Sequence, residues 1–153
     1  MDKLTLMTQL RQAERLRQRT ARMYRHLQAA IVFWSVIGCA GAATGLFTTA
    51  PSWIWIAGAV ILSTMATLTF AIRPADKATA QEEDARRYAQ LRTAGHSMDA
   101  VGLESALRKV RERDVPEIHL LRDVVYNDVV AEIGRPEKAV QLTRRQKLLG
   151  ALA

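Results

Sequence analysis

The side chains that could do chemistry in this sequence are few and scattered. His26, His96 and His119 have no metal-ligand spacing with Cys39 or with one another, so they predict no zinc or related metal site. The sequence has no glycine-rich phosphate loop and no serine or cysteine in a nucleophile elbow. We therefore predict that the protein is not an enzyme and has no catalytic residue, no bound metal and no cofactor.

Carboxylates offer a second kind of chemistry, because clustered acids can bind hard metal ions. The spacing of Asp114, Asp123 and Asp128 suits a capped, solvated helix face better than a metal site. Three consecutive acids earlier in the chain are likewise interpreted as solvated charges: Glu82, Glu83 and Asp84.

One long uncharged run dominates the sequence and determines which structural elements are available to position reactive side chains. Between His26 and Arg73 the chain contains no Asp, Glu, Lys, Arg or His. A bilayer-spanning helix needs about 20 mostly apolar residues. The run supplies two such stretches, residues 29–49 and 53–72, separated by a turn at Pro51 that is too short to hold a domain. We expect a transmembrane hairpin with both chain ends on one side of the membrane.

The charges are unevenly distributed along a chain whose net charge is +7. Residues 1–26 carry seven basic groups against two acidic ones, and residues 73–153 carry fifteen against thirteen. Basic side chains collect in the cytoplasmic segments that flank membrane helices. The predicted spans are flanked by Arg22, Arg25, Arg73 and Lys77, and the turn has no charge. We therefore expect both termini in the cytoplasm, and this account leaves a nucleic-acid partner unnecessary.

The N-terminal segment, residues 1–28, is predicted to be a basic helix. It has no Gly or Pro, and good helix formers dominate it. A weakly apolar stripe follows its helical period: Leu6, Leu10, Ala13, Thr20, Tyr24 and Leu27. The stripe could lie on anionic lipid or pack on the cytoplasmic helices. We favour packing because the stripe lacks bulky aromatic residues.

The C-terminal segment, residues 73–153, is predicted to be a cytoplasmic helical bundle. Its expected helices are residues 74–93, residues 98–113, a helix that follows an Asp114-Val115-Pro116-Glu117 capping box and ends near Ile133, and a last helix from Pro136. No run favours a strand. The predicted class is an all-α membrane protein with three regions, residues 1–28, 29–72 and 73–153.

Both predicted spans carry small residues at helical spacings. In lipid, small residues let helices approach closely, which drives their association. The predicted packing positions are Ser35, Gly38, Gly41, Ala42, Gly45, Ala59 and Ser63. They can close the hairpin itself. Because both spans have a second small or hydroxyl-bearing face, we expect self-association of the chain as well.

Polar and aromatic residues give the spans further roles. Ser63 and Thr67 are one helical turn apart and could line a narrow pore in an oligomer, or their hydroxyls could bond back to a carbonyl one turn earlier. The lack of ionisable residues in the spans argues against a transporter. The predicted membrane-interface anchors are Trp34, Trp53, Trp55, Arg22, Arg25 and Arg73.

Three stretches carry a likeness to a known family. They are the basic approach to the membrane at residues 19–27, the helix after the membrane with Lys77, Ala78, Ala85, Tyr88 and Leu91, and the Asp114-Val115-Pro116 break followed by a helix with Tyr126 and Asn127. With this order of parts, the chain resembles the SLATT family, the two-transmembrane effector domains associated with bacterial SMODS nucleotidyltransferases and SLOG proteins. The likeness covers nearly the whole chain and consists of helix-packing patterns.

The resemblance implies an oligomeric effector that forms a pore in the bacterial inner membrane or disrupts it, in antiphage abortive infection. It implies activation by a nucleotide signal or by a separate protein, such as a sensor or nucleotidyltransferase, because this chain has no recognisable sensor domain. It transfers no catalytic residue. The alternative, from a different class, is a membrane-anchored adaptor that recruits a soluble partner through its cytoplasmic helices.

Overall fold

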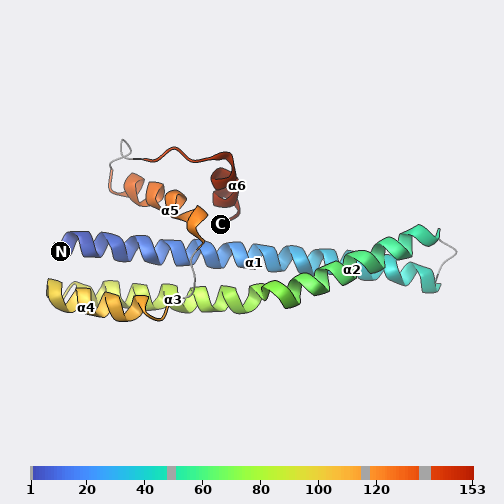
Figure 1. Cartoon of the computed structure of the whole chain (residues 1–153), viewed down its shortest axis with the longest axis horizontal. Coiled ribbons are helices and arrows are strands. Elements are labelled where there is room, and N and C mark those ends of the chain that lie inside the picture. Colours follow the sequence, from blue (N-terminus) through green and yellow to red (C-terminus); the bar gives the residue numbers. More distant parts are fainter. Residues whose placement is uncertain (1, 48–50, 115–117, 135–138) are drawn as a thin grey trace. The chain divides into compact units, whose positions relative to one another are not determined.

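The computed structural model of the chain describes residues 2–47, 51–114, 118–134 and 139–153. These residues form helices and no strand, so the all-α prediction is confirmed (Figure 1). The helices are α1 (Lys3–Phe47), α2 (Ser52–Ile72), α3 (Pro74–Gly95), α4 (Ala100–Arg111), α5 (His119–Glu132) and α6 (Arg144–Leu152). Residues 48–50 of the predicted turn and residues 115–117 of the predicted capping box lie outside the described residues.

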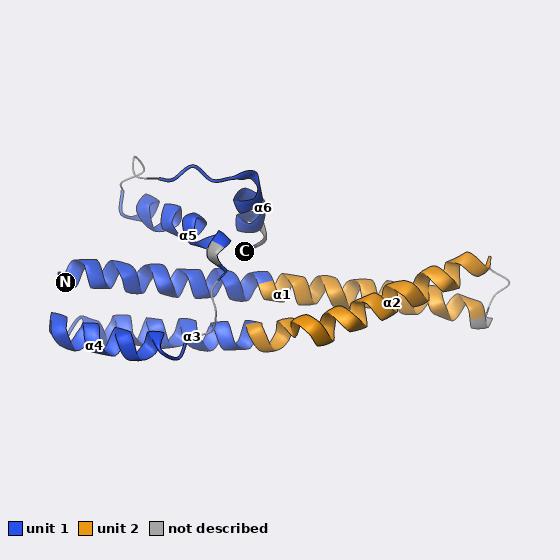
Figure 2. Cartoon of the chain, in the orientation of Figure 1, with its two compact units in different colours: residues 1–23, 78–153 blue, residues 24–77 orange. Residues whose placement is uncertain are grey.

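The chain forms two compact units (Figure 2). The first unit consists of residues 1–23 and 78–153, and the second consists of residues 24–77. The first unit therefore combines the two ends of the sequence, and α1 contributes residues to both units.

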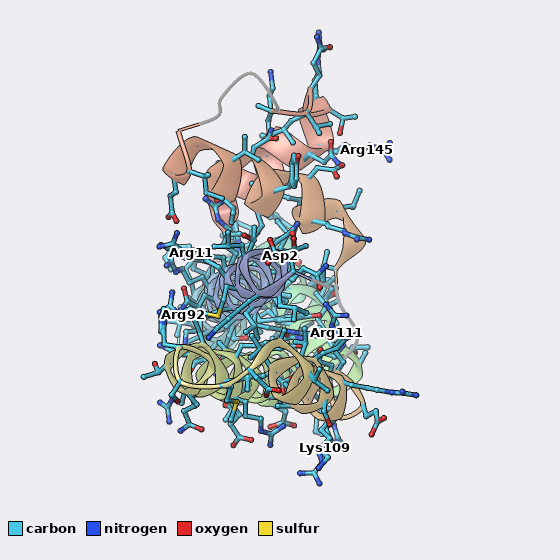
Figure 3. All side chains as sticks on the ribbon, turned by 90° about the vertical axis from the view of Figure 1, so that its left-hand side faces the viewer. Asp2, Arg11, Arg92, Lys109, Arg111 and Arg145 are labelled. Atoms are coloured by element: carbon cyan, nitrogen blue, oxygen red, sulfur yellow. The ribbon has the colours of Figure 1, made fainter. Side chains whose placement is uncertain are left out.

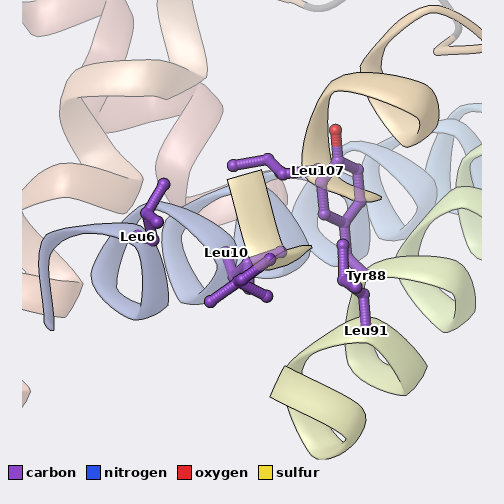
Figure 4. Packing of buried hydrophobic residues seen from close by; sticks show 6 residues of the cluster. Leu6, Leu10, Tyr88, Leu91 and Leu107 are labelled. Atoms are coloured by element: carbon purple, nitrogen blue, oxygen red, sulfur yellow. The ribbon is translucent and has the colours of Figure 1, made fainter. Parts of the chain in front are cut away.

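The first unit has a leucine-rich core between α1, α3 and α4. Leu6 and Leu10, one helical turn apart on α1, pack with Tyr88 of α3 and Leu107 of α4 (Figure 4). Asp99 caps α4 by accepting a hydrogen bond from the Gly102 amide at 3.0 Å. The N-terminal helix thus packs against α3 and α4 through part of its predicted stripe.

A second cluster of the same unit joins α1, α5 and α6. Leu16 of α1 is buried with three residues of α5: Leu121, Val125 and Val129. The last helix begins at Arg144, and residues 139–143 before it are not helical, so the prediction of a helix over those residues is wrong. Its predicted start, Pro136, lies outside the described residues. Asn127 holds the preceding segment in a non-helical form, because its side-chain amide donates to the Val140 carbonyl and accepts from the Val140 amide, both at 2.7 Å. Thr143 and Gln146 then form a capping box.

The second unit contains the apolar part of α1 and all of α2. Both helices are long and apolar enough to cross a membrane, and only 11% and 6% of their most apolar windows are buried. A core helix of a soluble protein would be mostly buried, so this exposure suggests a membrane protein. Arg73 caps the end of the α2 helix, where it adopts φ 47° and donates its amide to the Thr69 carbonyl at 3.0 Å. Pro74 then opens α3, a first-turn position that proline favours.

Candidate functional site

The first unit contains a buried polar network centred on Arg17 of α1. Its guanidinium lies 2.7 Å from an Asp114 carboxylate oxygen and donates to the Gln81 side chain at 3.2 Å. The Tyr88 hydroxyl donates to the same Asp114 oxygen at 2.5 Å. Arg17 is 1% exposed, whereas the basic side chains of Lys109 and Arg145 extend outward (Figure 3). The network thus links α1, α3 and the segment that follows α4.

The surroundings of Tyr88 keep its hydroxyl protonated. Burial raises the pKa of Tyr88 well above its ordinary value, and the hydrogen bond to the Asp114 carboxylate and its charge add to the effect. Arg17 and Arg111 oppose the shift through their positive charges. The hydroxyl is therefore a fixed hydrogen-bond donor, which suits a structural role and does not suit a general base.

This pKa shift predicts a loss of stability at high pH. An unfolded tyrosine ionises near pH 10, whereas the folded Tyr88 stays protonated, so its contribution is complete below about pH 10 and declines as the pH rises further. We would follow urea unfolding of the full chain in detergent by circular dichroism. We expect the urea concentration at the unfolding midpoint to decrease as the pH is raised from about 9 to about 11. Relative to each protein's own midpoint at pH 7, the decrease in the urea midpoint over this range should be smaller for the Tyr88→Phe variant than for the native chain. Parallel pH profiles for the two proteins would contradict the prediction.

Other acids that the sequence suggested were solvated are paired. Asp84 is 2% exposed and accepts a hydrogen bond from Arg87 at 3.0 Å, so the prediction of a solvated charge is wrong there. Asp123 accepts from Gln146 at 2.7 Å, and Asp128 lies 2.5 Å from Arg19. Asp123 and Asp128 therefore tie separate elements together, because each contacts a residue distant in the sequence.

The second unit has a seam where the two helix backbones touch. A methyl group built at Gly58 of α2 would lie 2.4 Å from the Ala42 amide nitrogen and 2.9 Å from the Gly38 carbonyl oxygen. One built at Gly41 would lie 3.1 Å from the Gly58 Cα. Only glycine permits such an approach. The predicted small residues Gly38, Gly41 and Ala42 are thus brought together within one chain.

The remaining predicted packing residues lie beside or away from this seam. Gly45 faces the side chain of Trp55, whose nearest ring atom would be 2.9 Å from an added methyl group. The Ser35 hydroxyl donates to the Ile31 carbonyl at 2.8 Å. Ala59 and Ser63 are exposed on the outer side of α2. The structure therefore uses part of the predicted set inside the hairpin and leaves part of it open.

The two residues predicted to line a pore are both exposed on α2. The Thr67 hydroxyl donates to the Ser63 carbonyl at 2.9 Å. This is the local bond that competes with pore lining, and Thr64 makes the same bond to Val60 at 2.8 Å. A pore lined by Thr67 would present a hydroxyl whose proton is already donated to the helix.

The predicted interface anchors are exposed in the structure, as their role requires. Trp34 is 47% exposed, Trp53 69% and Trp55 42%. The basic anchors Arg22, Arg25 and Arg73 are exposed as well. Their exposure is compatible with contact to lipid headgroups.

Sequence reasoning missed Arg17, Gln81 and Asp84, although a signal was present. Arg17 falls at the helical period of the stripe that contains Leu10 and Thr20, and Gln81 falls between Ala78 and Ala85 in the same way. A polar residue inside an apolar stripe indicates a buried partner.

Among the described residues, no group of three His, Cys, Asp or Glu side chains could hold a metal ion.

Comparison of the chain with family models, with curated proteins and with solved structures gives no match. The case for a function therefore depends on the geometry of the two units.

Proposed function

We propose that the chain is an oligomeric two-transmembrane effector that forms a pore in the bacterial inner membrane or disrupts it. The observation that carries the proposal is the outer side of α2, where Ala59, Ser63 and Ala66 are exposed. In lipid, a face of small and hydroxyl-bearing residues lets another helix approach closely. Since Gly58 already closes the hairpin from the other side, this face is open to a second copy of the chain.

The apolar surface of the hairpin supports a membrane setting. Val36 is 63% exposed, Trp53 69% and Phe70 81%. Soluble proteins rarely expose contiguous apolar surface of this kind. The basic residues that flank the hairpin favour cytoplasmic termini. In this proposal, lipid covers the exposed apolar side chains.

The antiphage part of the proposal is supported by the resemblance to the SLATT family. The order of a basic helix, a hairpin and a helical region resembles the order of parts in that family. In this proposal a nucleotide signal or a separate protein controls the first unit, and opening of the hairpin oligomer collapses the membrane potential.

The second candidate function, a membrane-anchored adaptor, is favoured by a different observation. The first unit has two hydrophobic clusters of its own, one around Leu10 and Leu103 and one around Leu121 and Val125. A folded helical unit with a basic surface could recruit an acidic soluble partner while the hairpin only tethers it.

Membrane potential in bacteria that express the full chain separates the two functions. We expect rapid depolarisation with the native chain and its loss in the Ser63→Leu variant, because the added bulk blocks helix approach on the outer side of α2. Val60→Leu is the matched control, since Val60 is already large, apolar and 59% exposed on the same helix. Gly41 is less suitable, because a side chain there would open the hairpin itself.

Depolarisation by the native chain and by Val60→Leu, but not by Ser63→Leu, supports an effector that self-associates through this face. Equal depolarisation by all three proteins contradicts the role of the outer α2 face. If none depolarises while all reach the membrane, even beside a nucleotide-producing partner, the adaptor is favoured, and affinity capture with the full chain would identify the recruited protein.

A further inference from the structure

A surface pocket in the first unit lies between α1 and α5. Its volume is about 280 Å³. Four polar residues of α1 and two acids of α5 line it: Arg15, Gln18, Arg19, Arg22, Asp128 and Glu132. Neither hydrophobic cluster includes these residues, so core packing does not account for them.

The basic residues of the pocket exceed its acids. Arg15 lies 2.8 Å from Glu132, and Arg19 lies 2.5 Å from Asp128. Glu132 is shared, because Arg11 also approaches it at 3.7 Å. Arg22 is exposed and has no ion-pair partner among the described residues. The pocket therefore presents one guanidinium whose charge is not neutralised, next to two that are paired with carboxylates, one of which, Glu132, is shared with Arg11.

The arginines also have a suitable spacing. Arg15, Arg19 and Arg22 follow one another at four and three residues, which places them on one face of α1 over about 10 Å at a rise of about 1.5 Å per residue. A guanidinium presents two parallel donors that match the oxygens of a phosphate group, and it is always charged. A compact anion with several phosphate oxygens could therefore contact two or three of these side chains.

We infer that this pocket binds a phosphate-bearing anion through Arg22, Arg19 and Arg15. The anion competes with Asp128 and Glu132 for the arginines, so its binding weakens the attachment of α5 to α1. The coupling is reciprocal, so a change that weakens the contact between α5 and α1 raises the affinity of the pocket for the anion. The inference concerns the first unit alone and does not require the hairpin to form a pore.

Inorganic pyrophosphate is the probe for this site. We would titrate it by calorimetry into the full chain in phosphatidylcholine nanodiscs at constant ionic strength. We expect saturable binding that weakens at least about tenfold in Arg22→Gln, because a charged donor is lost. Glu132→Gln should bind more tightly, because a competing carboxylate is removed. Arg86→Gln and Glu83→Gln are matched controls for charge, both exposed on α3, and should bind as the native chain does.

Hydrogen exchange gives a second readout. Pyrophosphate should speed amide exchange in α5 of the native chain and leave α4 unchanged. No saturable binding, or equal weakening in Arg22→Gln and Arg86→Gln, would overturn the inference. Since Arg22 is exposed and unpaired, its replacement should not prevent folding, and the circular dichroism spectrum checks this.

Nanodiscs with phosphatidylglycerol distinguish the two sources of the phosphate group. If a lipid headgroup occupies the pocket, these discs should weaken pyrophosphate binding to the native chain, and Arg22→Gln should show no such lipid dependence. If the natural ligand is a free anion, the ratio of native to Arg22→Gln affinities should be the same in both lipids. Both results support a phosphate site and assign its source.

Discussion

Replacing Gly58 with leucine is expected to separate the two helices of the hairpin. An added Cβ at this position would meet backbone atoms of α1 at 2.4 Å and 2.6 Å, and backbone cannot rotate away as a side chain can. The helices must therefore move apart and lose the contacts along the whole seam. Overpacking of this kind costs about 1–3 kcal/mol, and more where the surroundings cannot yield.

Tryptophan fluorescence measures this effect selectively. The chain has three tryptophans, and all of them lie in the second unit: Trp34, Trp53 and Trp55. Unfolding of the full chain by sodium dodecyl sulfate in mixed micelles, followed by this fluorescence, should begin at a lower detergent fraction in Gly58→Leu.

The smaller change to alanine provides a matched comparison. Gly58→Ala should destabilise the hairpin, whereas Gly45→Ala should be nearly neutral, because the obstacle at Gly45 is the half-exposed side chain of Trp55. Alanine is favoured over glycine in a helix by about 0.5–1 kcal/mol at both sites, so helix propensity cancels. Equal midpoints for the two alanine variants would show that the backbone contact at Gly58 is not what holds the seam.

Replacing Arg17 with leucine is expected to destabilise the first unit by about 3–5 kcal/mol, the usual cost of removing one partner from a buried ion pair. The Asp114 carboxylate, 14% exposed, would lose the counter-charge of Arg17, and the hydrogen bond from Arg17 to Gln81 would be lost. Hydrogen exchange over α3 in the full chain should rise strongly, while the tryptophan fluorescence of the hairpin stays unchanged.

Two further variants separate charge from packing. Arg108→Leu removes an arginine that is 84% exposed and lies 3.8 Å from Glu112, so it should have little effect. Adding Asp114→Asn to Arg17→Leu removes the uncompensated charge and should restore part of the protection of α3. A double variant less stable than Arg17→Leu would mean that the buried charge is not the source of the loss.

Much of the fold follows from the sequence, because several helices have a local signal at their ends. Pro74 opens α3 and Gly95 ends it, close to the predicted range of residues 74–93. The start of α6 also had a signal that was missed, since Thr143 and Gln146 have the spacing of a capping box. The side-chain amide of Asn127 binds the backbone of Val140, which is not helical, and no local sequence pattern predicts this contact.

The candidate site was less accessible to sequence reasoning. The position of Arg17 within an apolar stripe indicates burial, but its partner Gln81 is 64 residues away and depends on how α1 and α3 pack. The spacing of Gly41 and Gly45 indicates close helix contact. Whether the contact is within one chain or between copies depends on Gly58, because that residue provides the opposing surface.

The division of the first unit between the two ends of the chain sets an order of events during synthesis. Arg17 leaves the ribosome before the hairpin, and Gln81 follows it by 64 residues. At roughly 5–20 residues per second, this delay lasts roughly 3–13 s. During that time both apolar helices emerge, while the N-terminal helix has no α3 to cover its leucines. In the proposed membrane setting, the hairpin can therefore insert before the first unit folds, and a ribosome stalled just after α2 would hold that hairpin together with an N-terminal helix that has not yet met α3.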